Sequence, residues 1–114
     1  MTFLPACSVD DVPKGSALRV ELDHGADTVD VAIVHAEDDN FYAVHDECSH
    51  ASIPLSDGEV DGCTLECWLH GSRFDLRTGE PTGLPATEPV PVYPVEVRDG
   101  SVYVSLTSSN GVTR

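Results

Sequence analysis

Apolar and polar residues alternate in short runs along most of the chain, and turn-forming residues separate the runs. Residues 18–22 alternate, residues 29–34 form a β-branched run, and residues 41–44 follow the turn formers at 38–40. A period of two is typical of strands that bury one face, and helical periodicity is nearly absent. The pattern therefore predicts an all-β protein with a hairpin over residues 29–44.

A second hairpin is predicted near the end of the chain. Residues 95–98 and 101–104 alternate on either side of Asp99-Gly100, a preferred pair for a type I′ turn. Residues 60–65 supply another short strand, and five prolines between residues 81 and 94 predict an extended segment that covers a sheet edge. Together these elements favour a small antiparallel β-sandwich or barrel.

The length of 114 residues fits one domain, which we expect over residues 1–107 with a flexible tail over 108–114. No apolar run approaches the roughly 20 residues that cross a membrane. The first residues also lack the basic and apolar regions of a signal peptide. A cytoplasmic protein is therefore expected.

Charge narrows the choice of partner. Six basic and twenty acidic residues give a net charge of −14, and the stretch from Val20 to Ser72 holds thirteen carboxylates and no Lys or Arg. Such a field repels phosphate backbones and anionic lipids, so nucleic acid and membrane surfaces are poor candidate partners and none is expected. The acidity serves either solubility or docking of a basic redox partner, and both interpretations stay open.

Two short groups of residues carry candidate chemistry. Cys48-Ser49-His50 and Cys67-Trp68-Leu69-His70 each supply one thiol and one imidazole, with sixteen residues between His50 and Cys67. Cytosolic thiols are kept reduced, which favours metal binding or burial over disulfides. Two Cys and two His are the ligand set of a Rieske [2Fe–2S] centre. The same set is compatible with a tetrahedral structural zinc site, although zinc sites more often use C-x₂₋₄-C pairs.

The two groups, the second extended as Gly71-Ser72-Arg73-Phe74-Asp75, resemble the ligand loops of Rieske ferredoxins, and the likeness covers nearly the whole chain. The resemblance implies a Rieske-type antiparallel β-sandwich with a small cluster-binding subdomain, its loops spanning about residues 45–75. It implies one [2Fe–2S] cluster, with Cys48 and Cys67 on the buried iron and His50 and His70 on the outer iron. Further residues expected to contact this site are Ser72, Trp68 and Gly71.

The chain differs from a related branch of the family at two positions that bear on how the ligand loops are held together. Rieske subunits of cytochrome bc complexes carry a loop-linking disulfide, and the matching positions here are Ile53 and Leu69. The resemblance therefore implies that apolar packing holds the loops, with Trp68 and Pro54 as contributors.

A tyrosine that hydrogen-bonds a ligand sulfur in those subunits is replaced here by Phe74, which cannot donate. The resemblance thus implies a reduction potential toward the low end of the Rieske range of about −150 to +300 mV. Ser72 matches a serine of the high-potential proteins and opposes this shift in part.

The function that the resemblance implies is one-electron transfer, not catalysis. A monomeric carrier would pass electrons from a flavin-dependent reductase to a terminal non-heme iron oxygenase, as in ring-hydroxylating dioxygenase systems. The segment 66–79 is also similar to small Rieske proteins found beside iron–sulfur assembly genes in actinobacteria, and a structural zinc module is a third alternative. Outside the two groups, we expect structural roles for Cys7 and Cys63 and no metal ligation by His24, His35 and His45.

Overall fold

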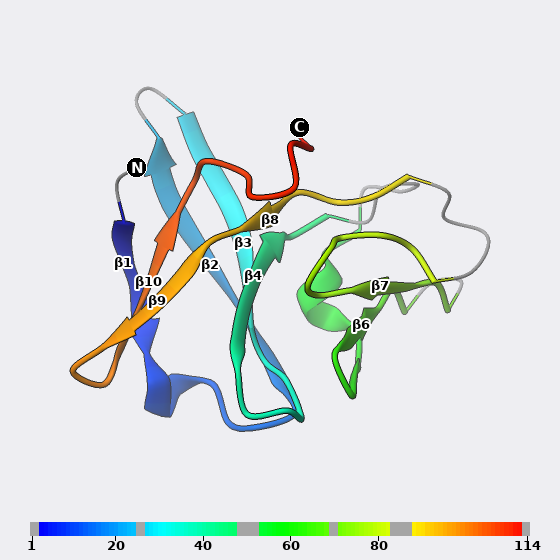
Figure 1. Ribbon diagram of the computed structural model, residues 1–114, viewed down its shortest axis with the longest axis horizontal. Coiled ribbons are helices and arrows are strands. Elements are labelled where there is room, and N and C mark those ends of the chain that lie inside the picture. Colours follow the sequence, from blue (N-terminus) through cyan, green and yellow to red (C-terminus); the bar gives the residue numbers. More distant parts are fainter. Residues whose placement is uncertain (1–2, 25–26, 48–52, 69–70, 83–87, 113–114) are drawn as a thin grey trace.

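The computed structural model describes residues 3–24, 27–47, 53–68, 71–82 and 88–112, and its strands form three antiparallel sheets (Figure 1). The first sheet has the order β1-β10-β9, the second β2-β3-β4-β8 and the third β5-β6-β7. The prediction of an all-β antiparallel sandwich with a small subdomain is confirmed. The bounds are β1 (Phe3–Ser8), β2 (Ser16–His24), β3 (Asp27–His35), β4 (Phe41–His45), β5 (Val60–Asp61), β6 (Thr64–Glu66), β7 (Arg73–Asp75), β8 (Val92–Tyr93), β9 (Val95–Arg98) and β10 (Ser101–Ser105).

Two 3-10 helices complete the described elements, η1 (Val9–Asp11) and η2 (Leu55–Asp57). The β5-β6-β7 sheet and η2 form the subdomain at one side of the larger sandwich (Figure 1). Among the described residues, no helix is long and apolar enough to cross a bilayer.

Strand β3 is buried on both faces. Its residues Val31 and Ile33 belong to the core of the larger sandwich, together with Val102 and Val104 of β10. The alternate residues Ala32 and Val34 belong to a second core, shared with the subdomain. All four β3 residues are fully buried, which explains the continuous apolar run in this strand. One strand therefore joins the two cores.

The predicted hairpin at the end of the chain is confirmed. Val97 pairs with Val102 and Arg98 with Ser101, so Asp99 and Gly100 form a two-residue turn. Both turn residues have positive φ, 51° for Asp99 and 79° for Gly100, as a type I′ turn requires.

Two expectations about strands were incomplete. Residues 60–65 are not one strand but the start of a hairpin, because Gly62 has a φ of +60° and turns the chain between β5 and β6. Strand β1 was not anticipated, since Pro5 interrupts its pattern. The pairing of β1 with β10 shifts register between Pro5 and Cys7, which accommodates the proline at a bulge.

The proline-rich segment covers a sheet edge, as predicted. Its strand β8 pairs with β4 through Ala43–Tyr93 and Val44–Val92. His45 N also donates to the carbonyl of Pro91 at 3.0 Å. This pairing fixes the end of β4, from which the first candidate ligand loop departs.

Residues 108–114 are expected to form a flexible tail, but the described part of this segment contacts the rest of the protein. The Asn110 side chain donates to the carbonyls of Val90 at 2.9 Å and Thr78 at 2.8 Å. Its oxygen accepts from Val92 N at 3.3 Å. Asn110 therefore connects the C-terminal segment to the loop after β7 and to β8.

Substitution Asn110→Ala is expected to destabilise the protein by about 2–3 kcal/mol, because it leaves the buried Val90 carbonyl and Val92 N–H without these partners. Urea unfolding followed by circular dichroism measures the loss. Ser108→Ala is the matched control, since it removes only the bond from Ser108 Oγ to Asn110. Equal stability of the two variants would contradict the anchoring role.

Candidate metal centre

The second candidate ligand loop is the connection between β6 and β7. Leu65 pairs with Phe74 and Glu66 with Arg73, so Cys67 directly follows the paired part of β6. Cys67 N donates to the carbonyl of Ser72 at 2.6 Å, and Gly71 N donates to the carbonyl of Cys67 at 2.9 Å. These two bonds close the loop at its base and fix the backbone of Cys67.

The Cys67 thiol lies in an apolar environment. Cys67 is fully buried and packs in the core that also contains Leu55, Leu65, Phe74 and Leu76. It is a free cysteine. A buried thiol held on a short, backbone-braced hairpin loop suits the inner ligand of a metal cluster, because thiolate is the ligand that iron–sulfur clusters prefer.

Three of the four predicted ligands, Cys48, His50 and His70, lie outside the described residues, as does Leu69. The structure does place both ends of the first loop. Asp46 follows β4, Ile53 and Pro54 lead into η2, and Leu55 anchors η2 in the same core as Cys67. The two candidate loops therefore start from elements that share one hydrophobic core, and the donor set of two Cys and two His fits a Rieske cluster.

The residues expected around the site differ in exposure. Ser72 is 1% exposed, and its carbonyl accepts from Cys67. Gly71 is exposed and has a φ of +76°, which permits the tight turn before Ser72. Trp68, in contrast, is 53% exposed. The prediction that Trp68 holds the loops by apolar packing is therefore not supported, and Leu55, Leu65 and Phe74 supply that packing instead.

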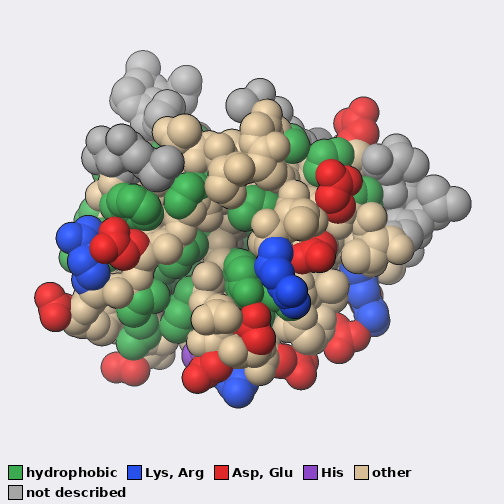
Figure 2. Space-filling view, in the orientation of Figure 1, with side chains coloured by type: hydrophobic (Ala, Val, Ile, Leu, Met, Phe, Trp, Pro, Cys, Tyr) green, Lys and Arg blue, Asp and Glu red, His purple; other side chains and the backbone are tan. Residues whose placement is uncertain are grey.

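The arginine after the second loop pairs with local carboxylates. Arg73 contacts Asp61 at 2.8 Å and Glu66 at 3.3 Å across the β5-β6-β7 sheet. On the face in Figure 2, basic side chains lie beside acidic ones and form no separate basic patch. Arg73 therefore offsets one of the two negative charges of Asp61 and Glu66.

A polar cluster lies at the far end of the subdomain. Tyr42 donates to Asp38 at 2.7 Å, and this bond lowers the pKa of Asp38. Burial, together with hydrogen bonds to Cys63 and Asp38, raises the pKa of Tyr42. Arg77 Nε donates to the Cys63 thiol at 3.3 Å, a contact that raises the pKa of Arg77. Cys63 thus has protein partners and a packing role.

Cys7 lies in β1, and burial, with Asp11 nearby, raises the pKa of its thiol. His35 stacks on Phe41 and contacts the Val12 carbonyl at 3.0 Å and Asp39 at 2.9 Å. His45 contacts the Tyr93 hydroxyl at 3.4 Å. Within the described ranges, no three His, Cys, Asp or Glu side chains gather in a way that suits a metal ion.

Comparison with known proteins identifies the class. The Rieske [2Fe–2S] domain family matches residues 2–94, so the chain belongs to this family. A [2Fe–2S] cluster is therefore its cofactor.

More particular similarity is to ferredoxin components of dioxygenases. The chain is 43% identical over 108 residues to the 3-phenylpropionate/cinnamic acid dioxygenase ferredoxin subunit of Photorhabdus laumondii, covering 94% of this chain and 97% of that protein. The ferredoxin of carbazole 1,9a-dioxygenase from Nocardioides aromaticivorans IC177 superposes with a TM-score of 0.79 at 33% identity, covering 92% and 98% of the two chains. A complex of reduced oxygenase and oxidised ferredoxin in carbazole 1,9a-dioxygenase contains a chain with a TM-score of 0.82 at 34% identity, covering 94% and 95%.

One feature of the site was not found by sequence reasoning. Asp46 is 3% exposed and binds Ser56, and Arg19 of β2 contacts it. The sequence shows an aspartate two residues before the candidate ligand Cys48, but it does not show that this carboxylate is buried. Arg19 is brought to it only by the pairing of β2 with β3.

Proposed function

We propose that this protein is the ferredoxin component of a dioxygenase system, in which it carries single electrons from a flavoprotein reductase to a terminal non-heme iron oxygenase. The observation that carries the proposal is the buried Cys67 on a braced hairpin loop, in a chain that spans nearly the full length of relatives named as dioxygenase ferredoxin subunits. The protein acts as a monomer and is itself no enzyme.

In this proposal Cys48 and Cys67 hold one iron, and His50 and His70 hold the other. When bound, the cluster supplies one-electron redox chemistry. The chain's own residues fix the ligand loops and exclude water from the cysteine side, where Cys67 packs among Leu55, Leu65 and Phe74. Trp68 and Gly71, which lie within this loop, are exposed, so the electron leaves through the side of the loop that faces solvent.

The reduction potential of the cluster is expected to depend on Phe74, which packs in the same core as Cys67. Phe74 is 1% exposed and has no hydroxyl group to donate toward the cluster. Hydrogen bonds to cluster sulfurs stabilise the reduced form, so their loss lowers the potential. We place the midpoint in the lower part of the range of about −150 to +300 mV.

An electron paramagnetic resonance spectrum of the dithionite-reduced protein tests the cofactor and its ligands together. We expect a [2Fe–2S] signal whose average g value lies below that of four-cysteine clusters. Electron delivery is tested by mixing the protein with the flavoprotein reductase and terminal oxygenase of a 3-phenylpropionate dioxygenase system and following product formation. A colourless protein with bound zinc and no acid-labile sulfide, or a Rieske signal without any electron transfer, would contradict the proposal.

A further inference from the structure

The buried carboxylate of Asp46 lies immediately after β4, and its side chain is fully shielded from solvent. It accepts hydrogen bonds from Ser56 N and from Ser56 Oγ, both at 2.7 Å. Arg19 Nη1 lies 3.5 Å from the same carboxylate. A buried charge is costly unless it is paired and hydrogen-bonded, and Asp46 meets both conditions.

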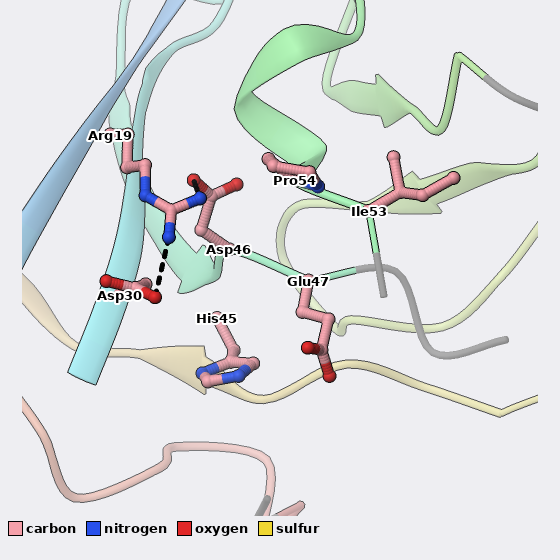
Figure 3. A pocket seen from close by; sticks show the side chains of 7 residues that line it. All are labelled: Arg19, Asp30, His45, Asp46, Glu47, Ile53 and Pro54. Carbon is pink, nitrogen blue, oxygen red and sulfur yellow. Dashed lines mark hydrogen bonds and ion pairs between the residues drawn. The ribbon is translucent and has the colours of Figure 1, made fainter. Parts of the chain in front are cut away.

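These contacts close the first candidate ligand loop at its base. Asp46 precedes the loop and Ser56 lies in η2 beyond it, so one side chain joins the two ends of the segment that contains Cys48 and His50. Arg19, Asp46 and Pro54 line a recess of about 180 Å³. In Figure 3, Arg19 and Asp46 lie on one side of it and Pro54 of the returning chain lies on the other.

Arg19 ties this closure to the larger sandwich. Its guanidinium contacts Asp30 of β3 at 2.7 Å as well as Asp46 (Figure 3). The backbone adds a further link, because Asp46 N donates to the Asp30 carbonyl at 2.9 Å. The loop base is thus connected to β2 and β3, and not to η2 alone.

We infer that Asp46, held by Arg19 and Ser56, is the positioning residue of the first ligand loop. The inference rests on the proposed ligands Cys48 and His50. With Ile53 and Leu69 in place of cysteines, this chain has no loop-linking disulfide at these positions, so the first loop depends more on the contacts that Asp46 makes at its base. Its negative charge, two residues before Cys48, also disfavours the added electron of the reduced cluster, and Arg19 opposes that effect.

Cluster release tests the positioning. In the purified holoprotein with excess iron chelator, Ser56→Ala is expected to lose its visible absorbance about tenfold faster than the parent protein, since a hydrogen bond to a charged acceptor is removed. Ser56→Thr keeps the hydroxyl and is expected to restore the parent rate. Ser16→Ala is the matched control, because it removes a hydroxyl bond of 2.6 Å to the Pro13 carbonyl far from the loop. Release from Ser56→Ala at the control rate, or no rescue by threonine, would overturn the inference.

The midpoint potential of the cluster distinguishes a positioning role of Asp46 near the cluster from a purely structural role in folding. Asp46→Asn keeps a side chain that can accept from Ser56 N and donate to Ser56 Oγ, but it removes the charge, so the potential is expected to rise. Arg19→Gln is expected to lower it. The pair Glu96→Gln and Arg98→Gln, which removes the same charges from a 3.3 Å ion pair on the distant hairpin, is the control.

Potentials in Asp46→Asn and Arg19→Gln that move no more than in the controls would overturn the inference, and Ser56→Ala still decides it if Asp46→Asn does not fold. A parent protein without a Rieske signal would instead refute the proposed function, so the two failures are distinguishable.

Discussion

Replacing Cys67 with serine is expected to yield a protein without its [2Fe–2S] cluster. The alcohol is a poor ligand for iron in such clusters, and Cys67 is fully buried at the base of its loop, where no other described thiol replaces it. Because cluster ligation contributes to the folding of small metal domains, the subdomain is also expected to lose stability. Iron and acid-labile sulfide content, with the visible spectrum, measure the result.

The other described cysteines provide the control. Cys7 lies in β1 and Cys63 between β5 and β6, and both are outside the two Cys-His groups at residues 48–50 and 67–70. Cys7→Ser and Cys63→Ser are expected to retain full iron and sulfide content. A Cys67→Ser protein with the parent spectrum, or loss of the cluster in Cys63→Ser, would refute the assignment of Cys67 as a ligand.

Substitution Gly58→Ala is expected to destabilise the subdomain by about 3 kcal/mol or more, at the upper end of the effects of overpacking. Gly58 follows η2, and a Cβ atom there would overlap the carbonyl oxygen of Glu66, the residue before Cys67. Both obstacles near this position, the Glu66 and Leu55 carbonyls, belong to the backbone and cannot rotate away. Relief requires η2 and β6 to separate, which displaces both candidate ligand loops.

Gly62→Ala separates this clash from general backbone effects in the same subdomain. Gly62 has a φ of +60°, but a Cβ atom there would meet no heavy atom within 4 Å, so alanine costs only about 1–2 kcal/mol of left-handed strain. Thermal unfolding and cluster content of the two variants are compared. The close approach at Gly58 is unimportant if Gly58→Ala is as stable as Gly62→Ala.

The parts of the fold that sequence predicts well are those fixed by local chemistry. Asp99-Gly100 forms its turn because both residues tolerate positive φ, and the alternation around it sets the register of β9 and β10. Strand β1 was missed because its pairing with β10 joins the two ends of the chain and its proline hides the pattern. The turn at Gly62 was missed because one glycine within an apolar run is a weak signal.

The candidate site, like the fold, could be predicted from the sequence only in part. The candidate ligand residues are recognisable because two Cys-His groups at these spacings form a specific pattern, and the buried position of Cys67 fits it. The contacts of Asp46 with Ser56 and Arg19 depend on strand pairing and on the path of η2, which no local pattern specifies. The exposure of Trp68 likewise depends on how the loop lies against the subdomain.

The double burial of β3 couples the stability of the two cores. Because Val31 and Ile33 line one core and Ala32 and Val34 the other, neither core can come apart without disturbing the same strand. We expect the two cores to open together, so that slowly exchanging amides of β10 and of β6 report the same free energy of opening in hydrogen exchange. A destabilising substitution in the β1-β10-β9 sheet would then also lower the protection of amides in the subdomain.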